Sequence, residues 1–230
     1  TDRTRDEYEF FLGSALANLQ PGARHRAILS SVVPALTETI TASLLSVSGS
    51  MPIIVGPGIK TGIKIRTEFP NEVGADLVCM AAAAFSLERA PCIIIDCRAM
   101  LTVSFVNGKG EFLGTTIFPG PETAIHAMRL YAAQLPETRI AVPKSSIGKN
   151  TMHAMQAGIH WGFKGAIEAI CEAFLEECIA HGEEKDNIRL IATGFPRYKT
   201  LFHPDASYIG TLALDGLAII SELNAEPLVC

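Results

Sequence analysis

The sequence predicts an α/β fold, because segments with helical spacing of apolar residues alternate with short apolar runs that are typical of buried strands. Glycine and proline separate most of these segments. The chain has 230 residues, of which 48% are hydrophobic, and its mean hydropathy is +0.27. This composition argues against disorder and allows one large domain or two small ones, each with a buried core.

The first part of the chain is expected to alternate helix and strand. Asp2 is expected to cap a first helix, and Pro21-Gly22 to end it. Apolar runs at 27–33 and 52–55 indicate buried strands, with a helix over 35–45 between them. Two strands with two helices make a poor domain, because such a sheet lacks neighbouring strands.

The second part repeats the pattern with more elements. The turn Asn107-Gly108-Lys109-Gly110 indicates a hairpin within a meander. The helix that begins at Thr151 has apolar positions all round, which is typical of a packed core or of a subunit interface. We expect helices at 71–86, 119–134, 151–181 and 214–223, and strands at 92–97, 101–106, 112–118 and 188–193.

Charge and cysteine usage exclude several classes of protein. The net charge of −5 without a basic stripe makes nucleic acid and anionic membranes poor partners. The longest charge-free stretch, 39–59, is interrupted by Ser, Gly and Pro, so it is no membrane span. The six cysteines and six histidines show no metal-binding spacing, which favours reduced structural thiols. We therefore expect a cytoplasmic protein without a signal peptide.

Three segments carry candidate chemistry: 56–62 (Gly-Pro-Gly-Ile-Lys-Thr-Gly), 70–77 (Pro-Asn-Glu-Val-Gly-Ala-Asp-Leu) and 148–151 (Gly-Lys-Asn-Thr). Asp76 is the one acid in an otherwise apolar run. A carboxylate there must be solvated in a cleft, paired or used, because burying it alone is costly. The alternative is an ordinary first-turn carboxylate that the helix dipole stabilises. Thr151 or Asn150 could likewise simply cap a long helix.

Together these segments resemble the type III pantothenate kinases, a branch of the acetate kinase, sugar kinase, Hsp70 and actin superfamily. The resemblance runs from Thr1 to about Asn224. It implies two similar ribonuclease H-like (actin-like) halves, over 1–66 and 67–230, each with a mixed sheet and helices around a central cleft. It also implies three further strands before Thr1, the first ending in an Asp-x-Gly-Asn-Thr phosphate loop, which would need roughly 30 residues. The first half is thus incomplete in this sequence.

The activity implied by this resemblance is the ATP-dependent phosphorylation of pantothenate at its primary hydroxyl, the first step towards coenzyme A. It implies Mg²⁺, a monovalent cation (K⁺ or NH₄⁺) and a homodimer. Asp76 would be the catalytic base, and Thr151 would reach pantothenate across the dimer interface. Leu77 stands where the family has Arg, so we expect weak pantothenate binding. The residues implied in pantothenate binding are Gly74, Ala75, Asp76, Leu77 and Thr151.

The implied ATP site departs from the family in two places. The family has Asp-Phe-Gly-Thr where this chain has Asp96-Cys97-Arg98-Ala99, so Asp96 is retained as the implied cation ligand while the phosphate-binding Gly and Thr are replaced. Arg98 could pair with Asp96, or it could bind phosphate and so recover part of the lost affinity. We expect weak ATP binding, because the Gly and Thr that meet the phosphates are gone. The family's adenosine-binding Gly-Gly is reduced to Gly194. Phe195 beside it could stack on adenine or plug the pocket.

Ala99 and Gly194 are therefore the predicted ATP contacts of this chain. Because these contacts are altered, a second function stays open: a catalytically impaired homologue that acts as a dimeric binding or regulatory protein. A third alternative is a kinase for another acid or sugar on the same fold, since a fold does not determine its substrate.

Overall fold

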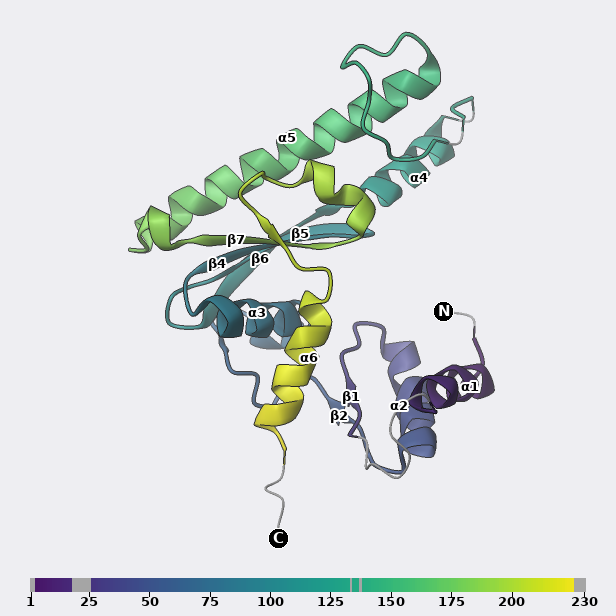
Figure 1. Ribbon diagram of the computed structural model, residues 1–230, viewed down its shortest axis with the longest axis vertical. Coiled ribbons are helices and arrows are strands. Elements are labelled where there is room, and N and C mark those ends of the chain that lie inside the picture. The colour runs from purple at the N-terminus through teal and green to yellow at the C-terminus, as the bar shows by residue number, and fades with distance from the viewer. Residues whose placement is uncertain (1–2, 18–25, 133, 137, 226–230) are drawn as a thin grey trace. The chain divides into compact units, whose positions relative to one another are not determined.

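The computed structural model describes residues 3–17, 26–132, 134–136 and 138–225 (Figure 1). It confirms the predicted α/β class, with helices packed on a mixed sheet. The chain forms two compact units whose segments interleave: the first takes 1–62, 68–83 and 213–230, and the second takes 63–67 and 84–212. The predicted halves at 1–66 and 67–230 stay a prediction.

The first unit contains the two N-terminal helices, a two-stranded parallel sheet and parts of two later helices. Thr4 caps the first helix, in place of the expected Asp2: its hydroxyl accepts from the Glu7 N–H, and the Glu7 carboxylate accepts from the Thr4 N–H at 2.7 Å. Asp2 and Pro21-Gly22 lie outside the described residues. The elements are α1 (Arg5–Leu16), β1 (Ile28–Leu29), α2 (Pro34–Ser48), β2 (Ile53–Ile54), α3 (Ala75–Glu88, of which 75–83 belong here) and α6 (Leu212–Leu223, from 213 on).

The strands β1 and β2 are shorter and less buried than expected. Ile28 pairs with Ile53, and Leu29 with Ile54, in parallel, and neither strand is fully buried. The expected continuation to residue 33 is wrong, because Ser31 turns the chain into α2 through hydrogen bonds between its hydroxyl and the N–H and C=O of Val33.

The helices α3 and α6 touch at backbone level. The expected start of α3 at 71 is wrong, because Pro70–Glu72 form a 3₁₀ turn before the helix begins at Ala75. A Cβ added to Gly216 of α6 would lie 1.9 Å from the Cys79 carbonyl oxygen, so only glycine allows this crossing. Just beyond α6, the Asn224 side chain accepts from the N–H of Lys60 (3.1 Å) and donates to its C=O (2.8 Å).

The second unit is built on a six-stranded mixed sheet with the order β3-β6-β5-β4-β7-β8. The strands β4, β5 and β6 form the expected antiparallel meander, and β7 returns in parallel beside β4. The two-residue strands β3 and β8 are additions to the predicted elements. The elements are β3 (Lys64–Ile65), β4 (Cys92–Cys97), β5 (Met100–Val106), β6 (Glu111–Pro119), α4 (Pro121–Tyr131), α5 (Thr151–Ala180), β7 (Arg189–Gly194) and β8 (Ser207–Tyr208).

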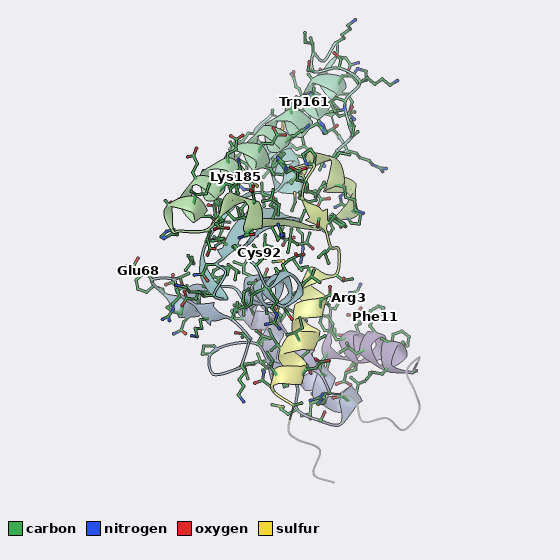
Figure 2. All side chains as sticks on the ribbon, turned by 60° about the vertical axis from the view of Figure 1, so that its left-hand side comes forward. Arg3, Phe11, Glu68, Cys92, Trp161 and Lys185 are labelled. Atoms are coloured by element: carbon green, nitrogen blue, oxygen red, sulfur yellow. The ribbon has the colours of Figure 1, made fainter. Side chains whose placement is uncertain are left out.

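The long helix α5 runs along one face of this sheet (Figure 1). Alternate residues of β4, namely Ile93, Ile95 and Cys97, belong to the same buried cluster as a stripe of α5 side chains. Trp161, labelled in Figure 2, is 47% exposed, so α5 also presents an apolar side chain to its surroundings.

The remaining predictions concern thiols and membranes. Five cysteines, at 79, 92, 97, 171 and 178, are free and buried, as expected of structural thiols, while Cys230 lies outside the described residues. No helix among the described residues is long and apolar enough to cross a membrane.

Candidate active site

The predicted nucleotide-side residues meet where β4 and β7 end. These strands are parallel and in register, with Asp96 beside Thr193 and Cys97 beside Gly194. Their carboxyl ends therefore lie at one edge of the sheet, where the polar side chains of α/β proteins commonly gather around a ligand. Asp96 also pairs with Thr102 across the antiparallel neighbour β5, which gives a row of three polar side chains on one face. The structure thus brings Asp96 and Gly194 to the same edge.

The Asp96 side chain forms an ion pair with Arg98. Asp96 is only 6% exposed, and its Oδ1 accepts a hydrogen bond from Arg98 Nε at 2.9 Å. Of the two roles left open for Arg98, pairing with Asp96 is the one the structure displays. A buried carboxylate needs such a partner, because an unpaired charge in the interior is strongly destabilising.

The turn that carries Arg98 and Ala99 is held against the start of α4. The Ala99 carbonyl accepts from the Gly120 N–H at 2.8 Å and from the Thr123 hydroxyl at 2.5 Å. A Cβ on Gly120 would lie 2.0 Å from the Arg98 carbonyl oxygen, so glycine is required there. Ala99 has no side-chain donor, and its carbonyl is already used within the fold. Any contact from Ala99 to phosphate would have to come from its own backbone N–H.

Gly194 occupies a position that only glycine fits. Its φ is +110°, and an added Cβ would lie 2.2 Å from the Cys97 carbonyl oxygen. The Tyr208 hydroxyl donates to the Gly194 carbonyl at 2.7 Å. Gly194 therefore joins the ends of β4, β7 and β8. The fold itself requires glycine at this position, whether or not Gly194 contacts ATP.

The ring of Phe195 is already stacked. The Arg197 guanidinium lies 4.2 Å from the ring centroid, and Tyr198 approaches edge-on with centroids 5.8 Å apart. Arg197 also forms an ion pair with Glu122 on α4. Burial raises the pKa of Tyr198, and the nearby positive charge of Arg197 opposes this rise. Adenine could stack on the ring face that Arg197 covers only if Arg197 moved. This arrangement therefore favours the alternative in which Phe195 fills the adenine pocket over the one in which it stacks on adenine.

In the first unit, Asp76 lies in the first turn of α3. Its Oδ1 accepts from the Leu77 N–H at 3.0 Å, which holds the carboxylate at the start of the helix. A Cβ on Gly74 would lie 2.7 Å from Asp76 Oδ1 and 3.5 Å from a methyl group of Val32. Gly74 thus leaves room for the carboxylate to lie back over the backbone, beside the segment that follows β1.

The residues around Asp76 are mostly apolar. Leu77 is 8% exposed and belongs to the core, so it fills space and offers no donor where the family has Arg. Burial raises the pKa of the Cys79 thiol to about 11; a hydrogen bond with Ser30 lowers it and the Asp76 charge raises it. Cys79 is therefore a neutral thiol near the carboxylate, which leaves Asp76 as the candidate base of this segment.

Thr151 is the first residue of α5, in the second unit, and is exposed. Asn150 caps the helix: its Oδ1 accepts from the His153 N–H at 2.9 Å. A Cβ on Gly148 would lie 2.2 Å from the Ala154 nitrogen, so the chain passes close to the helix start only because this residue is glycine. Since Asn150 is the cap, the Thr151 side chain is not needed for capping.

Several residues near the sheet edge contribute to the candidate site although they are not predicted from the sequence. Gly120 and Thr123 bind the Ala99 carbonyl, Arg197 stacks on Phe195, and the buried Thr193 hydroxyl lies beside Asp96 without a hydrogen-bond partner among the described residues. In the sequence, Pro119-Gly120-Pro121 indicates only a helix start. Thr123 follows this helix start closely, so it falls in the first turn of the helix. That position is the only feature of the sequence that could have suggested its hydrogen bond with the Ala99 carbonyl.

Two cavities of the second unit differ in charge. A cavity of about 420 Å³ is lined by three arginines and one histidine against a single acid, so it suits an anion. Its charged lining residues are Glu122, His126, Arg129, Arg139 and Arg197. Since Arg197 also covers Phe195, this cavity adjoins the candidate nucleotide side.

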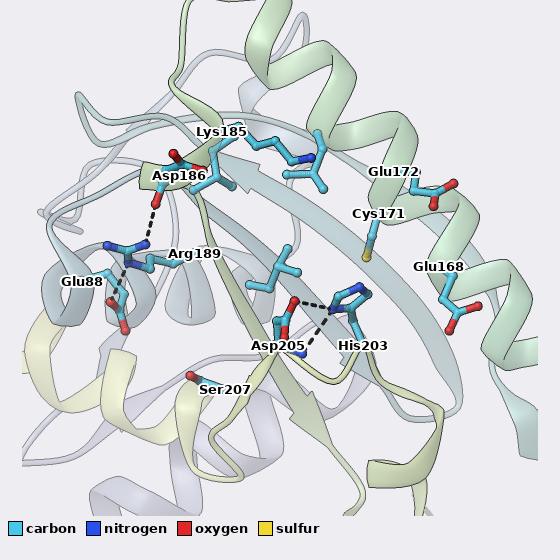
Figure 3. Close-up of a pocket in the computed structure, with 13 residues that line it drawn as sticks. Glu88, Glu168, Cys171, Glu172, Lys185, Asp186, Arg189, His203, Asp205 and Ser207 are labelled. Carbon is cyan, nitrogen blue, oxygen red and sulfur yellow. Dashed lines mark hydrogen bonds and ion pairs between the residues drawn. The ribbon is translucent and has the colours of Figure 1, made fainter.

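A larger cavity of about 610 Å³ has the opposite charge (Figure 3). Arg189 and His203 are already engaged there: Arg189 lies 3.8 Å from Glu88 and donates to the Asp186 carbonyl, and His203 lies 3.7 Å from Asp205. The charged lining residues are Glu88, Glu168, Glu172, Lys185, Asp186, Arg189, His203 and Asp205. Acids outnumber bases, so this cavity is unsuited to the triphosphate of ATP.

The family profile and the sequence relatives agree on one family. The sequence profile of the family described as type III pantothenate kinase matches residues 1–173. A type III pantothenate kinase of Geobacter sulfurreducens is 37% identical over 230 residues, which cover 97% of this chain and 87% of the relative. One from Geobacter sp. strain M21 is 40% identical over 204 residues, with 86% and 76% covered.

A solved structure shows the same fold. It is that of a conserved Campylobacter jejuni protein assigned to the Baf family of transcriptional activators, and it superposes with a TM-score of 0.57. The alignment covers 93% of this chain and 88% of the other, at 18% identity, so this likeness concerns the fold alone.

Proposed function

Since this chain belongs to the type III pantothenate kinase family, we propose that it is an ATP-dependent kinase that phosphorylates pantothenate to 4'-phosphopantothenate, the first step of coenzyme A biosynthesis. The observation that carries the proposal is the first turn of α3. It holds one carboxylate, Asp76, anchored by the Leu77 N–H above a glycine that leaves room for it. Phosphoryl transfer to an alcohol needs such an oriented base for the attacking hydroxyl.

The pantothenate side is assigned to the two retained motifs. Asp76 accepts the hydroxyl proton, and the hydrogen bond from the Leu77 N–H orients its carboxylate. Gly74, Ala75 and Leu77 shape the surface beside it, with Leu77 offering an apolar side chain. Thr151 offers a hydroxyl at an exposed helix start, where backbone N–H groups favour a negatively charged partner.

The ATP side is assigned to the edge where β4 and β7 end. Ala99 and Gly194 would contact ATP through backbone groups, and Asp96 is the retained acid of the motif. ATP arrives with Mg²⁺, whose charge neutralises the phosphates. The neighbouring cavity with Arg129, Arg139 and Arg197 gives this side a positive potential that favours a phosphorylated ligand.

The homodimer and the cytoplasmic location belong to the same proposal. An apolar side chain of α5, Trp161, is 47% exposed, which supports an interface with a second copy at this helix. In the proposed dimer, Thr151 of one subunit lies near Asp76 of the other, and the two residues share one pantothenate site. A kinase with five free buried thiols suits the reducing conditions of the cytoplasm.

A coupled assay of ADP release tests the activity. The full-length protein, with any residues that precede Thr1, is incubated with ATP, Mg²⁺ and pantothenate. ADP release that requires pantothenate, with a phosphorylated product of the correct mass, supports the proposal. Pantothenate-independent ADP release, or turnover with another acid or a sugar alone, contradicts it.

One observation favours the second candidate, a catalytically impaired binding or regulatory homologue. The Asp96–Arg98 pair and the engaged Ala99 carbonyl occupy the edge where phosphate contacts belong. Two lost phosphate hydrogen bonds at ~1.5–3 kcal/mol each would weaken ATP binding by roughly two to four powers of ten.

Calorimetric titration of Mg²⁺–ATP into the wild type and an Arg98→Gly, Ala99→Thr double variant, both in potassium buffer, distinguishes the two candidates. Tighter binding by the double variant supports an impaired nucleotide site. Micromolar affinity in the wild type that the double variant loses would instead identify Arg98 as a phosphate ligand.

A further inference from the structure

The ion pair at the end of β4 joins a buried acid to a cation from the same turn. Asp96 is almost fully buried, and the cation that neutralises it is Arg98, two residues further along the chain. A guanidinium stays charged at every relevant pH, so its charge is a fixed property of this site. The monovalent cation implied by the family would have to bind at this same carboxylate.

The residues present do not fit such a cation. Arg98 Nε already donates to Asp96 Oδ1 at 2.9 Å. A bound K⁺ would place a second positive charge within a few ångströms of the guanidinium, with a single carboxylate between them. Like charges at that distance repel strongly in a partly buried site, where water screens them poorly.

The position of Arg98 is held by its backbone. The Arg98 N–H donates to the Met100 carbonyl at 2.9 Å, which closes the turn between β4 and β5. The next carbonyl, that of Ala99, accepts from Gly120 and Thr123 at the start of α4. Since the turn is tied to both the sheet and a helix, the Arg98 side chain starts from a fixed point beside Asp96.

We propose that Arg98 supplies, as part of the chain, the positive charge that a bound monovalent cation would supply at Asp96. The protein therefore needs neither K⁺ nor NH₄⁺ for stability at this site or for turnover. The catalytic part of this statement rests on the proposed kinase function, whereas the binding part does not.

The surroundings of Asp96 predict how the site responds when the guanidinium is removed. The Asp96 carboxylate would remain in the row with Thr102 and Thr193, and the buried Thr193 hydroxyl has no partner among the described residues. Carboxylate and hydroxyl oxygens are suitable ligands for a hard monovalent cation. Arg98→Gln, which keeps much of the length but loses the charge, should therefore gain a response to K⁺, while Arg98→Lys should not.

The test compares melting temperatures in KCl and in tetramethylammonium chloride at matched ionic strength. We expect the wild type and Arg98→Lys to melt at the same temperature in both salts. Arg98→Gln should melt several degrees lower in tetramethylammonium, because it removes the guanidinium charge that faces the buried Asp96 carboxylate, and K⁺ should restore part of the loss. The matched control is Arg66→Gln, which breaks the more exposed Arg66–Glu111 pair and should show no response to K⁺.

The wild-type measurement alone can overturn the proposal, whatever the folding of the variants. A rise in its melting temperature with K⁺ that Asp96→Asn abolishes would show that a cation binds beside Arg98. A folded Arg98→Gln that ignores K⁺ would also overturn it, because Asp96 would then not be the cation position.

Turnover supplies a separate comparison. ADP release by the wild type should be equal in the two salts, and that of Arg98→Gln should rise with K⁺. Wild-type turnover that requires K⁺ overturns the proposal. Absence of turnover in both salts contradicts the kinase function and leaves the melting result to decide the role of Arg98.

Discussion

The carbonyl oxygen of Cys97 lies so close to Gly194 that a Cβ on Gly194 would come within 2.2 Å of it. The next N–H, that of Phe195, donates to the same carbonyl at 3.1 Å. The strands β4 and β7 therefore remain in register up to their last residues. This contact places Asp96 and the turn at Arg98 beside the residues that follow β7, and so builds the candidate nucleotide side.

Gly194→Ala should lower the free energy of unfolding by about 1–3 kcal/mol or more, because the new Cβ meets a strand carbonyl and φ is +110°. Urea unfolding followed by circular dichroism measures this. The control is Gly158→Ala in α5, where nothing lies within 4 Å of an added Cβ; helix propensity there predicts a gain of up to ~1 kcal/mol. Equal stability of Gly194→Ala and wild type would contradict the close contact.

Asp76→Asn should abolish turnover while the fold persists, because Asn is similar in size but cannot accept the hydroxyl proton. Loss of a positioned base typically lowers the rate by ~10²–10⁴. The measurement is kcat from ADP release, with circular dichroism as the check on folding. Asp215→Asn is the control, since Asp215 is also a first-turn acid, in α6 of the same unit. A variant at position 76 that keeps most of its activity would leave Asp76 as a helix-end carboxylate.

The protein should sediment as a dimer at micromolar concentration. Permanent interfaces of this type usually bury more than ~2,000 Å² in total, and the exposed apolar side chains of the second unit are available for one. Trp161→Ala should shift the equilibrium towards the monomer if α5 lies in the interface. A wild type that is monomeric by sedimentation velocity would exclude the shared pocket.

Thr151→Ala and Asn150→Ala should have different effects, although the residues are adjacent. Asn150 caps α5, so its replacement should lower stability by ~0.5–2 kcal/mol. Thr151 is exposed beyond the cap, so its replacement should raise the KM for pantothenate and leave the urea midpoint unchanged. If both variants change stability alone, Thr151 has no role in the substrate pocket.

Five thiols should be unreactive in the native state. Burial raises the pKa of Cys79 to about 11 and the pKa of the thiols at 92, 97, 171 and 178 to about 12. The thiolate is the reactive form, so titration with a thiol reagent near pH 8 should detect these five only after unfolding. Rapid modification of Cys97 or Cys171 in the folded protein would contradict their burial.

The same pKa shifts give a pH dependence of stability. Unfolded thiols lose their protons near pH 9, whereas the native ones retain them up to about 11 to 12. The native state then binds more protons, so the free energy of unfolding should fall as pH rises from about 9 towards 12. Urea midpoints across this range measure the slope, which Cys171→Ala should reduce.

The sequence predicts the structure best where one local signal is enough. The run 92–97 is apolar except for Asp96 and is buried on both faces, and β4 has these same bounds. The helix α5 begins at Thr151 as expected, because Asn150 is a strong cap. The strands β3 and β8 escape prediction, since two residues carry no periodicity.

Side-chain contacts at the candidate site are harder to predict, because they depend on residues far apart in the sequence. Thr123 binds a carbonyl 24 positions earlier, and Arg197 pairs with Glu122 across 75 positions. The sequence does not decide whether Arg98 pairs with Asp96 or binds phosphate. The two residues are two positions apart in the chain, and this spacing allows the Arg98 side chain to point towards Asp96 or away from it. Only the path of the turn between β4 and β5 decides between them.

The two hydrogen bonds between the Asn224 side chain and the Lys60 backbone have a consequence for how the protein folds during its synthesis on the ribosome. The first unit draws its segments from distant parts of the sequence, and α6 packs on α3 through Gly216. Domains often fold in order from the N-terminus as the ribosome makes them. Here the first unit cannot be completed until residues 213–225 have been translated, whereas the second unit, 63–67 and 84–212, is available earlier. Lys60 is therefore translated before the second unit, but its hydrogen bonds with Asn224 can form only after that unit has been translated.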